Sequence, residues 1–385
     1  MSALAAEVEQ QIDALLAAPT YSLEPAEQQA GLLKLLQNEL TYAADRNEPL
    51  RQYLDAWPTD YRAAVSLADL PYLPVGAFKA SPPLMLTGTE NIIRTLASSA
   101  TTGQTPSRVA LDAATSRRMV KGVVAIASDF IGPRRRPYLV IDTAATLAAG
   151  GELGARAAAI QGLRPFATEM VCCLNGDGAR EPRVDESRLA ACAAKWSAVE
   201  VLAYGFTSVI WQHFVQPLRE RGIRLRLPNI RVLHSGGWKR LQEQAVTREV
   251  FAAGVAEVFG CSADRVLDFY GMVENVGVIY PDCAYGHKHV PAFAAVIVRD
   301  PLTLRPVEEG QQGLVQVCSV LPTSFPGFLV LTDDIAEVIH YDGCACGRRG
   351  ISFRFVKRVP HAEIRGCGNI ETMRQRPVAA RAVHA

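Results

Sequence analysis

The sequence predicts an α/β protein with a β subdomain towards its C-terminal end, and three observations predict this fold class. From about Ile92, short apolar segments alternate with longer helical patterns, which favours a largely parallel sheet. From about Val290 the helical patterns stop, and β-type segments follow one another across turns. Residues 1 to about 60 instead have helical periodicity. We therefore expect four regions: a helical region over 1–90, an α/β domain over 91–289, a β-rich subdomain over 290–360 and a short tail over 361–385.

The N-terminal region is predicted to contain two helices. One face of the first helix carries four apolar residues at helical spacing: Leu4, Val8, Ile12 and Leu15. A second helix is expected from Pro25 to about Asp45. The first segment contains acidic residues and has no basic start before an apolar run, so it lacks the pattern of a secretory signal peptide.

The two sheets are predicted from segments of different type. Five apolar segments are expected to be strands of the parallel sheet: YLVID, TEMVCCL, VEVLAYG, RVLHSG and VLDFYG. Helices are expected over residues 207–222 and 238–260, after the third and fourth of these strands. The β subdomain is predicted from four further segments: AFAAVIVRD, GLVQVCSVL, FLVLTDDIAEVIH and ISFRFVKRV.

Composition and charge exclude several classes of function. The 385 residues carry a net charge of +1, so neither nucleic acid nor an anionic membrane surface is an expected general partner. No uninterrupted apolar stretch approaches the roughly 18 residues of a membrane-spanning helix. The nine cysteines are scattered, and without an export signal they are expected to be reduced thiols or metal ligands in a cytoplasmic protein.

The stretch SSATTGQTPSR, residues 98–108, lies between predicted strands at 92–97 and 108–112. A helix is expected at 114–131, with Thr115 as its N-cap. Clusters of Ser, Thr, Gly and Pro form solvated turns, and that is one interpretation of the stretch. In the other, backbone N–H groups and hydroxyls of the loop bind phosphate oxygens. It is not a phosphate loop of the Walker type, because no G-K-[ST] follows.

Three further segments follow or end predicted strands, where ligands of parallel sheets bind. HSGGW, which begins at His234, is either a tight turn or a place where the backbone approaches a ligand closely. In FYGMVENVG, Glu274 is either a surface acid or a Mg²⁺ ligand beside bound phosphates. In LTDDIAEV, Asp333 and Asp334 are expected at a strand end, as turn acids or as acceptors for ribose hydroxyls.

Cysteines and histidines form a second candidate site. CAYGHKH supplies Cys283 together with His289, or with His287 in its place, and GCACG supplies Cys344 and Cys346. Thiolates and imidazoles suit a tetrahedral Zn²⁺ ion. Because these two ligand segments are far apart in the sequence, such an ion would link the α/β domain to the β subdomain. The alternative is a set of buried thiols beside a surface histidine cluster.

The order of the Ser/Thr/Gly loop, the Gly-Gly turn, the Tyr-Gly-x-x-Glu segment and the Thr-x-Asp segment resembles the adenylate-forming superfamily of acyl-CoA synthetases and adenylation domains. LPYLPVGAFK, FYGMVENVG, GHKHVPAF and RGCGN are similar to the acyl-protein synthetase component of bacterial fatty-acid reductase complexes, a branch near phenylacetate–CoA ligases. The resemblance covers roughly residues 70–370. It implies the large N-terminal α/β domain of an adenylate-forming enzyme with a β subdomain, and a C-terminal lid domain that is missing or severely shortened.

The resemblance also implies an activity and a set of site residues. The protein would activate a carboxylic acid with ATP and Mg²⁺, and would pass the acyl group from an acyl-adenylate to a thiol. The phosphates of ATP would be bound by loop residues Ser98, Ser99, Thr101, Thr102 and Gly103. Adenine would be bordered by Ser235, Gly236, Tyr270 and Gly271, Mg²⁺ held by Glu274, ribose bound by Asp334, and the hinge formed at Arg358. Tyr204 and Phe206 would be walls of the carboxylate pocket. The candidate catalytic residues are Thr101, Glu274 and Arg358, together with Cys367 as an acceptor thiol.

Two departures from the superfamily pattern bear on the cation at the reaction centre. Ala100 stands where the superfamily has Gly, and Arg108 stands near the position of its Lys. The sequence also has no Lys beyond Lys357, where a lid would carry a catalytic one. The cation that neutralises the transition state is therefore open among Arg108, Lys288 and Arg365.

The acyl acceptor is open as well. Cys367 in IRGCGN has glycines that let the chain bend, and Arg365 favours its thiolate. The alternatives are a thiol of coenzyme A, of a carrier protein or of a partner acyl reductase, in which case Cys367 is a small residue of a flexible tail. The alternative function is a catalytically idle fold that serves as a partner-binding subunit of a biosynthetic complex, although a scaffold has no need of Glu274 and Asp334.

Overall fold

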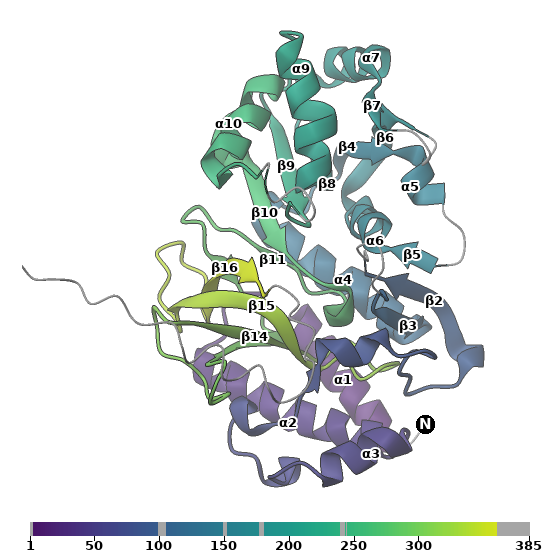
Figure 1. Ribbon diagram of the computed structural model, residues 1–385, viewed down its shortest axis with the longest axis vertical. Coiled ribbons are helices and arrows are strands. Elements are labelled where there is room, and N and C mark those ends of the chain that lie inside the picture. The colour runs from purple at the N-terminus through teal and green to yellow at the C-terminus, as the bar shows by residue number, and fades with distance from the viewer. Residues whose placement is uncertain are drawn as a thin grey trace, which may run out of the picture.

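The computed structural model describes residues 3–98, 105–148, 152–176, 181–238, 243 and 245–359. The chain begins with α1 (Ala3–Ala17), α2 (Pro25–Ala44) and α3 (Glu48–Asp55), which lie together at one end of the molecule (Figure 1). The two predicted N-terminal helices are confirmed, and Val8 and Ile12 of α1 are buried. Pro25 begins α2, where its fixed φ and missing N–H do no harm.

A seven-stranded sheet forms the other half of the molecule, with strand order β11-β10-β9-β8-β4-β6-β7. Its strands are β4 (Arg136–Thr143), β6 (Ala167–Asn175), β7 (Arg183–Val184), β8 (Val201–Phe206), β9 (Ile230–Ser235), β10 (Val266–Tyr270) and β11 (Tyr280–Pro281). The five central strands are parallel, whereas β7 and β11 pair antiparallel at the edges. The predicted parallel sheet is thereby confirmed.

Helices connect these strands. They are α4 (Ala113–Ile131), α5 (Ala144–Ala148), α6 (Ala155–Gly162), α7 (Glu186–Trp196), α8 (Thr207–Ile210), a π turn (Trp211–Val215), α9 (Gln216–Glu220) and α10 (Arg248–Phe259). Short 3₁₀ turns occur at Tyr61–Ala63, Leu67–Asp69, Val75–Lys79, Thr89–Asn91, Arg164–Phe166, Ala263–Arg265 and Val273–Asn275.

Two expectations about helix starts are wrong. Asp112, not Thr115, is the N-cap of α4, because the Asp112 side chain accepts a hydrogen bond from the Thr115 N–H. The helix expected over 238–260 begins only at Arg248, since the Thr247 hydroxyl caps α10 by accepting from the Val250 N–H. In both cases a side-chain oxygen at the N-cap decides where the helix begins.

The predicted β subdomain is also confirmed. Its sheet has the order β12-β16-β15-β14-β13, and β1 (Leu73–Pro74) pairs with β15. The strands are β12 (Lys288–His289), β13 (Ala294–Arg299), β14 (Gln312–Ser319), β15 (Leu329–His340) and β16 (Ser352–Arg358), which pair antiparallel. A small third sheet contains β2 (Ile92–Ala97), β3 (Arg108–Asp112) and β5 (Glu152–Gly154).

Two apolar cores hold the molecule together. One core joins the N-terminal helices to the β subdomain, and the Gln28 side chain of α2 donates hydrogen bonds to the carbonyls of Pro291 and Ala294 across this contact. The other core fills both faces of the seven-stranded sheet. The packing thus groups the first and third expected regions, and the four-region boundaries stay a prediction.

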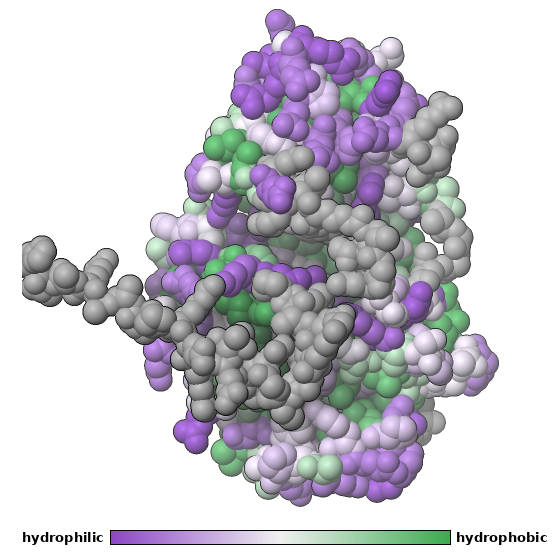
Figure 2. All heavy atoms as spheres, in the orientation of Figure 1, coloured by the Kyte–Doolittle hydropathy of each residue, from purple (hydrophilic) through white to green (hydrophobic). Residues whose placement is uncertain are grey.

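The outer surface is mixed in character. Hydrophilic side chains cover most of the end formed by α7 and α9, whereas apolar side chains reach the surface near β16 (Figure 2). Among the described helices none is both long and apolar enough to span a membrane. Every described cysteine is a free thiol.

Candidate nucleotide site

The carboxyl ends of β8, β9 and β10 lie side by side, which is where parallel sheets bind ligands. The turn after β9 contains Gly236, whose φ is 83°. A Cβ at Gly236 would also lie 2.7 Å from a ring carbon of Phe206. Glycine is therefore required at the turn for two reasons, its backbone conformation and its packing. Gly271 is different, because a Cβ there would come no nearer than 3.5 Å to the atoms around it.

A chain of hydrogen bonds holds the turn after β9 in place. The hydroxyls of Tyr204 and Ser235 are 2.8 Å apart. The Thr207 hydroxyl donates to the carbonyl of Ser235 at 3.1 Å and lies 2.9 Å from Nδ1 of His234. Burial lowers the pKa of His234 to about 4, so its ring is neutral near pH 7. The turn is therefore fixed by neutral side chains of β8, of β9 and of the first residue of α8.

Lys288 extends this network to β12. Its ammonium donates to Asp268 at 2.7 Å and to Asp282 at 3.1 Å, and Arg248 also contacts Asp282. Nδ1 of His234 lies 3.5 Å from the Asp268 carboxylate. Lys288 is buried; although burial lowers its pKa, the two carboxylates raise it above the usual value. Lys288 is thus occupied by structural partners, which leaves Arg108 and Arg365 as the other candidates for a cation at the reaction centre.

Glu274 lies in the 3₁₀ turn after β10 and is only 4% exposed. Burial raises the pKa of Glu274 above its usual value, although a hydrogen bond from the Ser107 side chain and the charge of Arg358 act in the opposite direction. Ser107 also joins Glu274 to the Ser/Thr/Gly loop, because the Ser107 N–H donates to Oγ of Ser98 and its carbonyl accepts from the Ser98 N–H. The ends of the loop are therefore held next to Glu274.

Asp334 lies in the middle of β15, which corrects the expectation of a strand end. The acidic pair continues the strand because Asp334 is paired in the sheet with Arg358, whose guanidinium neutralises it. Nε of Arg358 donates to Oδ1 at 2.8 Å and Nη2 to Oδ2 at 3.3 Å, while the Tyr270 hydroxyl donates to Oδ2 at 2.8 Å. Tyr270, Asp334 and Arg358 are thus brought together, as the resemblance implies.

The other candidate residues are the two proposed pocket walls, Tyr204 and Phe206, and a group that lies outside the described residues. Tyr204 is fully buried and stacks on Phe269 at a centroid distance of 5.7 Å, so its hydroxyl rather than its ring faces the turn after β9. The pocket role of Tyr204 and Phe206 stays a prediction. The remaining candidates lie outside the described residues: Ser99, Thr101, Thr102, Gly103, Arg365 and Cys367.

Sequence reasoning missed two residues that hold the site together, Ser107 and Thr207. Ser107 stands inside the quoted Ser/Thr/Gly stretch, so its polar type alone could have indicated it. Thr207 begins α8 directly after β8, a position that faces the neighbouring strand end. Only the pairing of β8 with β9 shows that its hydroxyl reaches Ser235.

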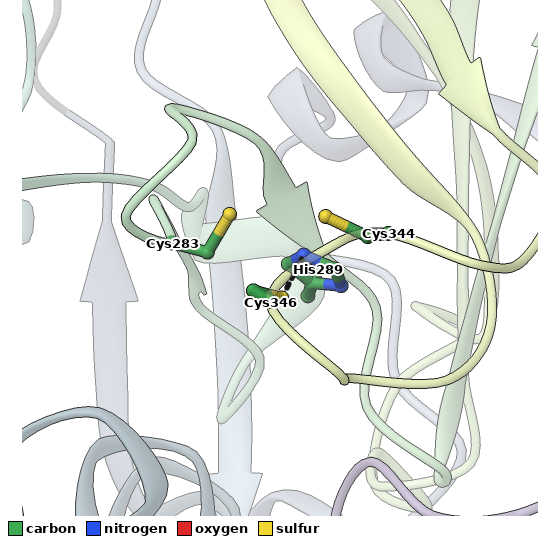
Figure 3. A group of neighbouring side chains, drawn as sticks. All are labelled: Cys283, His289, Cys344 and Cys346. Carbon is green, nitrogen blue, oxygen red and sulfur yellow. Dashed lines mark hydrogen bonds between the residues drawn. The ribbon is translucent and has the colours of Figure 1, made fainter.

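The predicted metal ligands converge. The side chains of Cys283, Cys344 and Cys346 gather around His289, from the segment before β12 and the segment after β15 (Figure 3). Their ligand atoms all lie within 4.8 Å of one another, and Sγ of Cys346 is 3.2 Å from Nε2 of His289. His287 lies beside the group, with Nδ1 3.5 Å from Sγ of Cys344. Three thiols and one imidazole form a donor set that suits Zn²⁺.

Solved structures share this fold. An open conformation of 2-hydroxyisobutyryl-CoA ligase in complex with 2-HIB-AMP and CoA gives a TM-score of 0.69 at 18% identity, over 89% of this chain and 77% of that one. The same ligase in its postadenylation state with 2-HIB-AMP gives 0.67 at 18% identity, over 88% of this chain and 69% of that one. The fold is therefore the mixed α/β fold, with several sheets, of adenylate-forming enzymes.

The family within this class follows from the sequence. The profile of the acyl-protein synthetase family, LuxE, matches residues 4–376, and the chain belongs to this family. The long-chain-fatty-acid–luciferin-component ligase of Vibrio harveyi is 33% identical over 138 residues, and that of Aliivibrio fischeri 28% over 142. The matched segments cover 35% and 36% of this chain, and the same shares of those ligases.

Proposed function

We propose that this protein activates a carboxylic acid with ATP as an acyl-adenylate and transfers the acyl group to a thiol. The observation that carries the proposal is Glu274. Its carboxylate is buried at the base of the Ser/Thr/Gly loop, where the hydrogen bond from Ser107 and the charge of Arg358 do not offset the burial that raises its pKa. A buried carboxylate that its protein partners stabilise only in part gains from a ligand that supplies further positive charge. A divalent cation beside phosphates supplies it.

The first step joins the acid to the nucleotide. A carboxylate oxygen of the acid attacks the α-phosphorus of ATP, and the bond to pyrophosphate breaks in line. Asp334 accepts hydrogen bonds from the ribose hydroxyls, and Glu274 holds Mg²⁺. When bound, that ion neutralises charge on the phosphates. Arg358 donates hydrogen bonds to Asp334 and so orients the carboxylate that binds the ribose. The loop residues Thr101, Thr102 and Gly103 bind phosphate oxygens.

The second step transfers the acyl group. A thiolate attacks the acyl carbonyl, AMP leaves with the electrons of the broken C–O bond, and a thioester forms. We propose Cys367 as the acceptor, since Arg365 favours its thiolate. A long-chain fatty acid is the proposed substrate class, because the two ligases above are named for it. A partner acyl reductase is the proposed next acceptor.

Pyrophosphate exchange into ATP, measured over a panel of carboxylic acids, tests the first step. We expect exchange that depends on one class of acid and on Mg²⁺; no exchange with any acid would contradict the proposal. For the second step, ATP and the active labelled acid should label the chain through a bond that hydroxylamine cleaves. Cys367→Ser should abolish the label and keep the exchange. A label that persists in this variant, or that forms only on added coenzyme A, would exclude Cys367 as the acceptor.

We also propose that Cys283, His289, Cys344 and Cys346 bind one structural Zn²⁺ ion. The convergence of four donor atoms within 4.8 Å supports it, as does their origin, because Cys283 precedes β12 and His289 ends it, whereas Cys344 and Cys346 follow β15. An ion there would tie the short edge strand β12, and with it Lys288, to the segment that follows β15. Its role would be folding energy rather than chemistry.

Metal analysis of protein purified without added zinc tests this site. We expect about one zinc ion per chain, and its loss in Cys344→Ser with a lower melting temperature. Cys261→Ser is the matched control, since Cys261 is a free thiol outside the cluster. Protein that contains no zinc, or a Cys344→Ser variant that keeps it, would remove the site.

A further inference from the structure

The hairpin that ends in β12 carries two kinds of side chain on opposite faces. Asp282 and Lys288 form an antiparallel bridge, and the Cys283 N–H donates to the carbonyl of His287 at 2.8 Å. Because successive residues of a strand point to opposite faces, the Asp282 and Lys288 side chains share one face. Cys283 and His289, their neighbours in the chain, lie on the other face with the metal-ligand candidates. One short hairpin therefore contributes side chains to two sites.

The face of the hairpin that carries Lys288 leads to the turn after β9, which is proposed to border adenine. Lys288 donates to Asp268 at 2.7 Å, and the Asp268 carboxylate lies 3.5 Å from Nδ1 of His234. The same Nδ1 is 2.9 Å from the Thr207 hydroxyl, which donates to the carbonyl of Ser235 at 3.1 Å. Consecutive contacts thus join the metal-ligand hairpin to the nucleotide site.

The contacts of Lys288 are strong, whereas the strand that carries it is short. Lys288 and His234 are buried, and an unpaired charge inside a protein is costly, so the position of Lys288 fixes that of Asp268. β12 has only two residues, lies at the edge of its sheet and pairs with β16. A short hairpin has little stability of its own. A metal ion that ties β12 to the segment after β15 would therefore hold Lys288 in place.

We infer that Lys288 couples the proposed metal site to the nucleotide site, so that the affinity for ATP depends on bound Zn²⁺. The ion fixes β12, β12 places Lys288, and Lys288 holds Asp268 and through it the turn after β9. This inference rests on the proposed function, because it needs both ATP and Zn²⁺ as ligands. Lys288 is a positioning residue, since it acts through Asp268 and not on the nucleotide.

The first test removes the charge of Lys288 and measures ATP binding by calorimetry. In Lys288→Met we expect the Kd for ATP to rise about fivefold or more, while the zinc content and the KM for the acid stay unchanged. Lys195→Met is the matched control, because Lys195 lies on α7 and pairs with Glu169. Asp268→Asn should raise the Kd in the same way. It leaves Lys288 paired with Asp282, so it keeps the test decisive if Lys288→Met does not fold.

The second test removes the metal. Unaltered protein from which a chelator has removed the zinc should bind ATP as weakly as Cys344→Ser does, and added zinc should restore binding only to the unaltered protein. Lys288→Met combined with Cys344→Ser should bind ATP no more weakly than Lys288→Met alone, because both changes act along one path. Linkage also requires that ATP tighten zinc binding by the same factor. Competition with a chelating dye in excess Mg²⁺ measures this, with Lys288→Met as the control that shows no effect of ATP.

An unchanged Kd for ATP in both Lys288→Met and Asp268→Asn would overturn the inference, and so would additive effects in the double variant. Protein that loses its zinc without a change in ATP binding would overturn it too, and would leave the metal site and the proposed chemistry standing. Protein that contains no zinc contradicts the proposed metal site, and protein that binds no ATP contradicts the proposed function. Either of these last two results also removes the coupling.

Discussion

The turn after β10 and the middle of β15 each bury one carboxylate, and it is the carboxylate of β15 that forms an ion pair with Arg358, at 2.8 Å. Asp334 of β15 is 1% exposed and receives three hydrogen bonds, two from Arg358 and one from Tyr270. Glu274 is 4% exposed, and its pKa is raised because burial outweighs the hydrogen bond from Ser107. One carboxylate is paired within the fold, and the other is not.

The difference indicates separate roles for two groups of the same chemistry. A paired carboxylate keeps a fixed orientation and can still accept hydrogen bonds, which suits the recognition of ribose hydroxyls. An unpaired buried carboxylate gains most from a bound cation, which suits a Mg²⁺ ligand. The four predictions below test this comparison.

Glu274→Gln should have the largest effect. Pyrophosphate exchange at saturating ATP and Mg²⁺ should fall by at least about a hundredfold, because a charge that neutralises phosphates is lost with the metal ligand. Glu308→Gln, which removes an exposed acid of the segment between β13 and β14, is the control. Exchange in Glu274→Gln within about threefold of the unaltered protein would remove Glu274 from the reaction.

Asp334→Asn should mainly weaken ATP binding. We expect the Kd for ATP to rise about tenfold, since an amide accepts ribose hydrogen bonds less well than a carboxylate and no longer fixes Arg358. Calorimetric titration with ATP measures it. An Asp334→Asn protein that binds ATP normally would show that the paired carboxylate is structural only.

Arg358→Gln should make Asp334 resemble Glu274. The substitution removes the only guanidinium that pairs with Asp334 among the described residues, so the free energy of unfolding near pH 7 should fall by about 1–2 kcal/mol. Urea unfolding at pH 7 measures the change. A stability equal to that of the unaltered protein would mean that solvent or Tyr270 satisfies the carboxylate alone.

The smallest effect concerns the stability cost of Glu274. Because its folded-state pKa is raised above the unfolded value, the folded protein binds this proton more tightly, and stability falls as the pH rises from the unfolded pKa through the folded one. Glu274→Gln lacks this loss, so it should be more stable than the unaltered protein near pH 7, and urea unfolding measures the difference.

The pH dependence provides the control for that result. The difference in unfolding free energy between Glu274→Gln and the unaltered protein should shrink as the pH falls through the raised pKa of Glu274. Added Mg²⁺ and ATP should stabilise only the unaltered protein. A variant that is less stable at every pH would show that the carboxylate is satisfied without a cation.

The order of the strands and helices and the candidate site residues could be predicted from the sequence alone. Segments such as 92–97 and 108–112 have their predicted bounds, because short apolar segments next to residues such as Asn and Ser are typical of strands. The four metal-ligand candidates could be named from residue type, because the thiolates of Cys and the imidazoles of His are ligands that suit Zn²⁺.

The contacts between these residues, and the effect of those contacts on charge, could not be predicted from the sequence. Nothing local distinguishes His289 from His287, yet the ligand atom of His289 lies within 4.8 Å of all three thiols. Val356 of β16 has no partner on β15, because Ile335 pairs with Lys357 and Ala336 with Phe355. This bulge could not be predicted from the strand pattern, since it arises from the register between β15 and β16. The contrast between Glu274 and Asp334 has the same origin. Burial and ion pairing depend on strands far apart in the sequence, and a long-range contact carries no signal in the residues next to it.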